Sequence, residues 1–112
     1  MKLKDIFLNY KKKKIRLEVK DCNDLQKGVG LMFSRRVNAR ALLFDFKKKT
    51  NVALTSYFVF FPFVVIWMDG KKIVDVKIIK PFKFIIRSEK SFDKIVEIPI
   101  NEKYKDKVKF FV

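Results

Sequence analysis

The strictest hydrophobic pattern in the chain is the segment 15–20, Ile-Arg-Leu-Glu-Val-Lys, in which apolar and charged residues alternate without exception. Successive side chains of a strand point to opposite faces, so this segment predicts a half-buried strand. Its inward residues are Ile15, Leu17 and Val19. The four lysines Lys11–Lys14 just before it repel one another, and they predict a solvated loop or the exposed start of a strand.

The longest apolar run is Tyr57–Met68, twelve residues interrupted only by Pro62. A helix needs about 20 residues to cross a bilayer, so we expect no membrane span here. Aromatic and β-branched residues dominate the run, which favours a strand buried on both faces. We therefore expect Phe58 and Phe60 in the core, although exposed rings could also stack on single-stranded nucleic acid. Because proline cannot donate to a ladder, Pro62 belongs at an edge, a strand start or a bulge.

The dipeptide Asp69-Gly70 follows this run and is typical of a two-residue hairpin turn. We expect it to join strands over Phe63–Met68 and Lys71–Ile79. If Met68 pairs with Lys71, the register buries Trp67 and places Asp75 opposite Val64.

The rest of the chain predicts several further short strands. They cover Leu3–Leu8, Ala41–Phe46, Phe82–Arg87, Lys94–Ile98 and Val108–Val112. Lys47–Asn51 is typical of a solvated turn, and Asp21–Asp24 could cap a short helix or turn over Leu25–Val29. Short strands separated by turns about every ten residues indicate a sandwich or barrel. We expect a mainly β, single-domain protein over residues 1–112. Its fold should be a β-sandwich of the jelly-roll type or a half-open barrel, with at most one or two short helices.

The net charge of +15 suggests an anionic partner, such as nucleic acid, a phosphorylated metabolite or acidic lipid. A Lys-rich source proteome would give the same charge without any function. Lys outnumbers Arg 22 to 5, whereas base readout and bidentate phosphate binding usually prefer Arg.

The chain has no His and a single Cys, Cys22. These absences remove the commonest general base and the common nitrogen and sulfur metal ligands. We therefore expect no transition-metal site and no cofactor, and we interpret Cys22 as a small residue in a turn. The N-terminal residues show no apolar signal region, so the protein is expected to be intracellular, in the cytoplasm.

Five residues are candidates for binding a ligand. Three of the arginines, Arg35, Arg36 and Arg40, lie close together after a glycine-bounded bend, where they could hold a phosphate or carboxylate or simply form a solvated loop. Glu97 lies between Val96 and Ile98, so its side chain either faces solvent or lines a concave face, where it could pair with Arg35. Asp75 could supply a second carboxylate near Val64.

Four segments in this order resemble one family. They are Gly30–Arg35 (Gly-Leu-Met-Phe-Ser-Arg), Leu42–Phe46 (Leu-Leu-Phe-Asp-Phe), Phe58–Phe63 leading to Trp67-Met68-Asp69, and Val96–Pro99 (Val-Glu-Ile-Pro). They resemble the motifs of domain of unknown function 192, a small family of archaea and bacteria, over about Leu17 to Phe110. The resemblance implies a compact, mainly β domain and no particular activity. Val64 stands where the family has an acidic residue after Pro-Leu, so any chemistry of that carboxylate could be missing.

Three functions follow in order of preference. The first is a non-catalytic binding module for a small anionic ligand or partner, which would use a concave sheet face and the Arg35–Arg40 loop. The second is weak, sequence-independent binding of nucleic acid through the basic surface. An enzyme with a site centred on Glu97 or Asp75 comes third, because acid–base catalysis without His would need two carboxylates close together.

Overall fold

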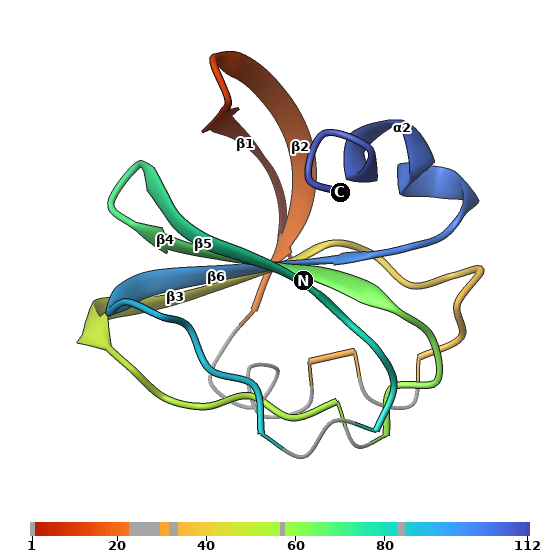
Figure 1. Ribbon diagram of the computed structural model, residues 1–112. Coiled ribbons are helices and arrows are strands. Elements are labelled where there is room, and N and C mark those ends of the chain that lie inside the picture. The colour runs from red at the N-terminus through yellow and green to blue at the C-terminus, as the bar shows by residue number, and fades with distance from the viewer. Residues whose placement is uncertain (1, 23–29, 32–33, 57, 83–84) are drawn as a thin grey trace.

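The structure, a computed structural model, describes residues 2–22, 30–31, 34–56, 58–82 and 85–112. Six strands form one sheet (Figure 1). They are β1 (Lys2–Tyr10), β2 (Lys13–Asp21), β3 (Leu42–Thr50), β4 (Phe63–Asp69), β5 (Lys72–Ile79) and β6 (Phe92–Pro99). A 3-10 helix, η1 (Glu102–Tyr104), and a short α-helix, α2 (Lys105–Val108), follow the last strand.

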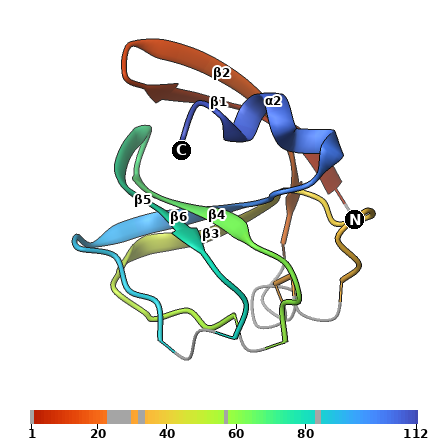
Figure 2. The same ribbon diagram turned by 45° about the vertical axis from the view of Figure 1, so that its right-hand side comes forward.

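The strand order is β1-β2-β3-β6-β4-β5, so β2, β3, β6 and β4 lie inside the sheet and β1 and β5 are its edges. Every pair is antiparallel except β2 and β3. The sheet is strongly curled, and the β1–β2 hairpin stands over one face beside α2 (Figures 1 and 2). The expectation of a mainly β, half-open barrel with short helices is confirmed.

Apolar side chains on the two faces of the sheet form two separate cores. The first core lies between the sheet, the β1–β2 hairpin and the C-terminal helices, and it contains the predicted inward residues Ile15, Leu17 and Val19. The second core lies on the other face, under the long loops, and it includes Trp67, Phe44 and Phe92. Because both faces are covered, every residue from Phe63 to Met68 is buried, as the unbroken apolar pattern predicts.

The β4–β5 hairpin differs from its predicted register. The turn residues are Gly70 and Lys71, because Asp69 pairs with Lys72 and belongs to the strand. A register shift between Trp67 and Met68 then moves Trp67 opposite Asp75. The predicted pairing of Asp75 with Val64 is therefore wrong, and Val64 pairs with Ile78. The burial of Trp67 is confirmed, with an exposed fraction of 0%.

Three predicted elements are also wrong. Val108–Val112 is not a strand: Val108 ends α2, and Tyr104, Val108 and Phe111 share one buried side at helical spacing. In the predicted strand Phe82–Arg87, the described residues contribute only an isolated bridge between Ile86 and Leu54. Most of the predicted turn at Lys47–Asn51 belongs to β3, which continues to Thr50 past an irregularity marked by the positive φ of Lys47, +60°.

The apolar run before β4 is less buried than predicted. Phe58 and Phe60 lie in the loop and are 43% and 58% exposed, so the expected core position is wrong for both. Pro62 comes directly before the strand, in one of its predicted places. The predicted helix or turn over Leu25–Val29 lies outside the described residues. Within the described part of the chain, no helix has the length and apolar character needed to cross a membrane.

Candidate functional site

Glu97 is the one buried carboxylate among the described residues. It lies in the interior strand β6, directly opposite Leu42 on β3 and Val65 on β4. Its exposed fraction is 5%, so the predicted alternative of a solvent-facing position is wrong. The reason is that β6 is covered on both faces, so alternation along this strand switches a side chain from one core to the other.

Gly30 packs directly over the Glu97 carboxyl group. A Cβ built on Gly30 would lie 3.3 Å from Oε1 of Glu97 and 3.6 Å from Cζ of Phe44. The φ of Gly30 is +55°, a conformation that favours glycine. The fold thus brings together two motifs that are far apart in the sequence, the one that begins at Gly30 and the one that contains Glu97.

Burial raises the pKa of the Glu97 carboxyl to about 8. Among the described residues, none forms a hydrogen bond or an ion pair with this carboxyl. The carboxyl is therefore mostly protonated at pH 7 and can act as a hydrogen-bond donor. In the described part of the chain no group of three His, Cys, Asp or Glu residues is placed to hold a metal ion.

The three candidate arginines do not converge on one point. The guanidinium Nε of Arg36 donates to the carbonyl oxygen of Ile100 at 2.7 Å. Nη1 of Arg40 lies 3.9 Å from Oε1 of Glu18 on β2. Arg35 is exposed, and no contact in the described structure joins it to Glu97. The predicted cluster is therefore a loop with separate contacts, and whether its arginines bind a ligand stays a prediction.

Asn101 and Tyr104 hold this arginine loop against the C-terminal helices. The Asn101 amide donates to the carbonyl oxygens of Arg36, at 2.8 Å, and Ala39, at 3.1 Å. Its oxygen caps η1 by accepting from the backbone N–H of Tyr104, at 3.2 Å. The Tyr104 hydroxyl accepts from the backbone N–H of Ala41 at 2.9 Å. Sequence reasoning missed both residues, although Asn before a helical pattern is a known capping signal.

Asp75 lies on the edge strand β5, and its carboxylate has local partners. It accepts from the backbone N–H of Glu89 and of Val76, both at 2.9 Å. The Lys77 ammonium lies 4.0 Å from it. These contacts tie the β5 strand to the loop before β6, and they occupy both oxygens of the carboxylate.

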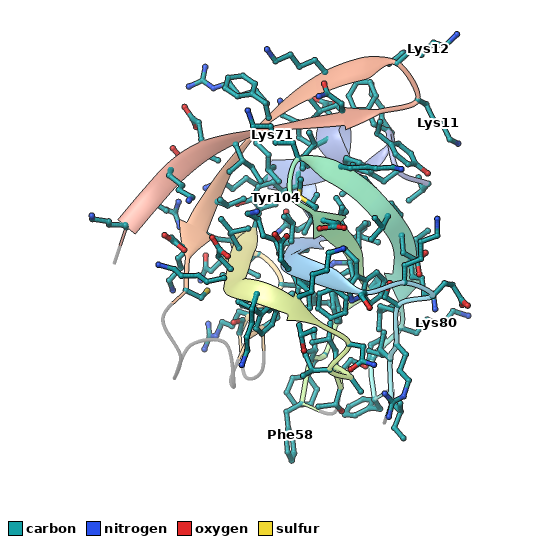
Figure 3. All side chains as sticks on the ribbon, turned by 90° about the vertical axis from the view of Figure 1, so that its left-hand side faces the viewer. Lys11, Lys12, Phe58, Lys71, Lys80 and Tyr104 are labelled. Carbon is teal, nitrogen blue, oxygen red and sulfur yellow. The ribbon has the colours of Figure 1, made fainter. Side chains whose placement is uncertain are left out.

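A groove lined with lysines lies between the β1–β2 hairpin and the turn of the β4–β5 hairpin, and we call it the lysine groove. Its volume is about 490 Å³, within the usual range for small-molecule sites. Lys71, at the hairpin turn, lies on the side of the molecule that carries the β1–β2 hairpin (Figure 3). We call its apolar lining residues, which include Ile6, Leu43 and Met68, the floor, and its charged ones the rim. The rim includes Lys4, Lys14, Lys71 and Lys94 and one carboxylate, Asp5, which is paired with Arg16.

The charge in the lysine groove is only partly neutralised. Lys94 is 3.4 Å from Asp93, and Lys4 is 3.9 Å from Asp21. Within the described residues, no ion pair involves Lys14 or Lys71. The Lys14 ammonium lies 4.7 Å from the ring centre of Phe7, a side chain that is 53% exposed at the groove. Sequence reasoning missed this site because its residues come from five strands and one hairpin turn that only the curled sheet brings together.

Comparison with known proteins gives a family but no activity. The sequence profile of domain of unknown function 192, described as an uncharacterized ACR, matches residues 6–109. The chain therefore belongs to this family, as its motifs predict. No curated protein matches the sequence.

Two solved structures share the fold. One is a protein from Sinorhizobium meliloti 1021 described as a "putative transcription regulator", with 19% identity and a TM-score of 0.73 over 91% of this chain and 82% of that one. The other is a protein of unknown function from Novosphingobium aromaticivorans, with 9% identity and a TM-score of 0.68 over 93% of this chain and 77% of that one. At these identities the similarity extends to the fold alone.

Proposed function

We propose that the protein is a binding module for a small anionic ligand and that the ligand occupies the lysine groove. The observation that carries this proposal is the pairing of a cationic rim with an apolar floor. Lys14 and Lys71 have no carboxylate partner among the described residues, and the floor contains the buried side chain of Met68. This combination favours a ligand with an apolar body and one or two anionic groups.

Lysines act as point charges and do not impose the bidentate geometry of an arginine. The lysine groove should therefore accept carboxylate, phosphate and sulfate groups with little discrimination. The exposed ring of Phe7 offers a flat apolar surface beside these charges. An aromatic or acyl body attached to the anion should strengthen binding relative to inorganic phosphate.

Nuclear magnetic resonance titrations test the proposal with three probes: inorganic phosphate, octanoate and adenosine monophosphate, each at about 150 mM salt. We expect amide shifts around Phe7, Lys14 and Lys71, larger for octanoate or the nucleotide than for phosphate. The double substitution Lys14→Glu with Lys71→Glu should abolish them.

A second double variant serves as the matched control, because it changes the net charge by the same amount. Lys48→Glu with Lys107→Glu alters lysines outside the groove and should leave the shifts intact. If both double variants lose the amide shifts equally, or if the shifts are scattered over the whole surface, binding depends on net charge and not on the lysine groove. Native mass spectrometry of freshly purified protein would show a ligand that co-purifies.

The arginine loop stays a second proposed location for the same class of ligand. A groove of about 430 Å³ is lined by Arg36, Asn101 and Lys105, among others. The Lys105 ammonium is 3.1 Å from Glu102, so Arg36 is the main cation offered to a ligand there. In the titrations above, shifts that disappear with Arg36→Glu and persist with Lys71→Glu would move the site to this loop.

Sequence-independent binding of nucleic acid is the second candidate function. It is favoured by the net charge of +15 and by the description of the Sinorhizobium meliloti protein as a "putative transcription regulator". We rank it below the small-ligand proposal because the charge is mostly Lys, which suits phosphate attraction better than base readout.

A further inference from the structure

Large apolar side chains gather at the end of the molecule opposite the β1–β2 hairpin. They belong to the loop before β4 and the loop after β5, and we call this surface the aromatic pole. Its members are Phe58, Phe60, Phe82 and Ile85, which are 43%, 58%, 56% and 58% exposed. Phe58 points away from the body of the protein at the far end from Lys11 and Lys12 (Figure 3).

The backbone under the aromatic pole is held by hydrogen bonds between the two loops. Leu54 and Ile86 exchange backbone hydrogen bonds of 2.8 Å in both directions. The carbonyl oxygen of Ser56 accepts from the backbone N–H of Phe82 at 2.9 Å, and the Ser56 hydroxyl donates to the carbonyl oxygen of Lys80 at 2.9 Å. These bonds fix the two loops to each other, so the exposed rings project from an ordered support.

Phe82 has a φ of +62°, which is rare for a bulky residue. Such strain persists where surrounding structure imposes it, and it is concentrated at functional sites. Here it accompanies a ring that points to solvent, while the neighbouring Phe61 and Ile86 are buried at 2% and 5% exposure. The loops thus divide their apolar residues into one set that completes the core and another that is presented outward.

Cations flank the aromatic pole. Lys80 and Arg87 line a shallow groove together with Ile85. No carboxylate of the described residues pairs with either cation. Lys77, in the same groove, is already bound: its ammonium donates to the carbonyl oxygen of Arg87 at 2.6 Å and lies 3.4 Å from Glu89.

We propose that the aromatic pole docks on the surface of an anionic lipid bilayer, with its rings inserted at the level of the headgroups. Aromatic side chains favour this interface, and nearby Lys and Arg are attracted to acidic headgroups. Binding of this kind scales with the apolar area inserted and with the negative charge of the lipid. The lysine groove lies elsewhere on the protein and is not needed for it.

Two other occupants fit the same surface less well. A second copy of the chain would bring another +15 charge, and four apolar side chains are few beside the roughly 20–30 residues each partner gives to a stable interface. Single-stranded nucleic acid needs ring faces on which bases can stack. Phe60 and Phe82 instead pack edge to face, with centroids 5.6 Å apart and planes at 72°, and Ile85 cannot stack.

Co-sedimentation with vesicles tests the proposal at about 150 mM salt. The wild type should bind vesicles that contain phosphatidylglycerol and bind pure phosphatidylcholine weakly. Phe60→Ser with Phe82→Ser should lower the partition coefficient at least about tenfold, the equivalent of ~1.4 kcal/mol. Val37→Ser, at a residue 76% exposed elsewhere on the protein, is the matched control and should bind like the wild type.

A fluorescent probe shows whether the rings insert. Trp67 is fully buried and should not respond, so the emission of Phe60→Trp should shift to shorter wavelength only with anionic vesicles. Unchanged vesicle binding by the double serine variant would overturn the proposal, because adsorption would then depend on net charge alone. So would a dimer in sedimentation velocity that this variant abolishes, or an oligonucleotide affinity that it lowers tenfold while vesicle binding is unaffected.

Discussion

Gly30 and Glu97 are in contact although they lie in different halves of the sequence, and a single added methyl group on Gly30 would sit 3.3 Å from Oε1 of Glu97. The backbone of Gly30 thus lies close to a buried carboxyl group that has no protein partner among the described residues.

Gly30→Ala should destabilise the protein by more than Gly70→Ala. Both glycines have positive φ, +55° and +62°, so both variants carry backbone strain of about 1–2 kcal/mol. Only at Gly30 does the added Cβ meet a neighbour within 4 Å. Urea titrations of the two variants measure the difference. Equal losses in the free energy of unfolding would show that the contact with Glu97 does not affect stability.

Glu97→Gln should change how stability depends on pH. The folded pKa of about 8 exceeds the ordinary value of 4.5, so the folded protein binds more protons than the unfolded chain between these values. The stabilisation that comes from proton binding at Glu97 is therefore complete below about pH 4.5, and it is lost as the pH rises toward about 8. Urea unfolding over this range should show the variant gaining stability relative to the wild type as the pH rises. If the free energies of unfolding of the variant and the wild type change with pH in parallel, Glu97 is not a buried, protonated residue.

Trp67→Ala should lower the free energy of unfolding by about 3–5 kcal/mol, the range for large core aromatics. Trp67→Phe should be clearly milder. The Trp67 indole N–H is buried and has no hydrogen-bond partner among the described residues, so Phe keeps an aromatic ring there and removes an unsatisfied donor. Denaturant titrations of both variants measure this, and a loss below about 1 kcal/mol for Trp67→Ala would contradict its core position.

Tyr104→Phe should destabilise the protein, because it removes only the hydroxyl group of Tyr104. Its removal leaves the buried backbone N–H of Ala41 without its acceptor, which should lower stability by about 1–3 kcal/mol. Hydrogen exchange of the Ala41 amide should accelerate. Tyr10→Phe is the control, because Tyr10 contacts Phe111 through its ring. Similar effects of the two variants would argue against the hydrogen bond.

Nucleic acid should bind weakly and without sequence preference. The charge of +15 attracts polyanions at low salt, but a protein with 6–10 phosphate contacts loses about 10³–10⁵ in affinity between about 50 and 200 mM salt. Fluorescence anisotropy with several single- and double-stranded oligonucleotides at about 150 mM salt measures this. Submicromolar binding with a tenfold preference for one oligonucleotide would place nucleic-acid recognition above the small-ligand proposal.

The sequence predicts those elements whose pattern clearly favours one structure. The alternation of Ile15, Leu17 and Val19 indicates a half-covered strand, and the β-branched and aromatic run Phe63–Met68 indicates a fully covered one. The C-terminal segment was ambiguous, because Val108 to Val112 is apolar enough for a strand. The helical character of this end of the chain is recognised by the spacing of Tyr104, Val108 and Phe111 and by Asn101, which caps the preceding helix η1.

The candidate site was harder to predict, for a physical reason in each case. The register shift beside Trp67 moved Asp75 away from Val64, and no local pattern marks such a shift. The burial of Glu97 depends on what covers β6 from both sides, which only long-range packing decides. The lysine groove depends on strand order, and strand order cannot be read from alternation along single segments.

The curl of the sheet has a consequence for how this chain behaves in a crowded solution. An open sheet leaves two edges on which another polypeptide could add a strand, a hazard for a chain with 13 Phe. Here the edge strands β1 and β5 approach each other, and lysines lie along both, at Lys2 and Lys4 on one and at Lys72 and Lys77 on the other. An incoming strand would meet like charge at either edge, so the same lysines that suit an anion should also keep neighbouring copies apart.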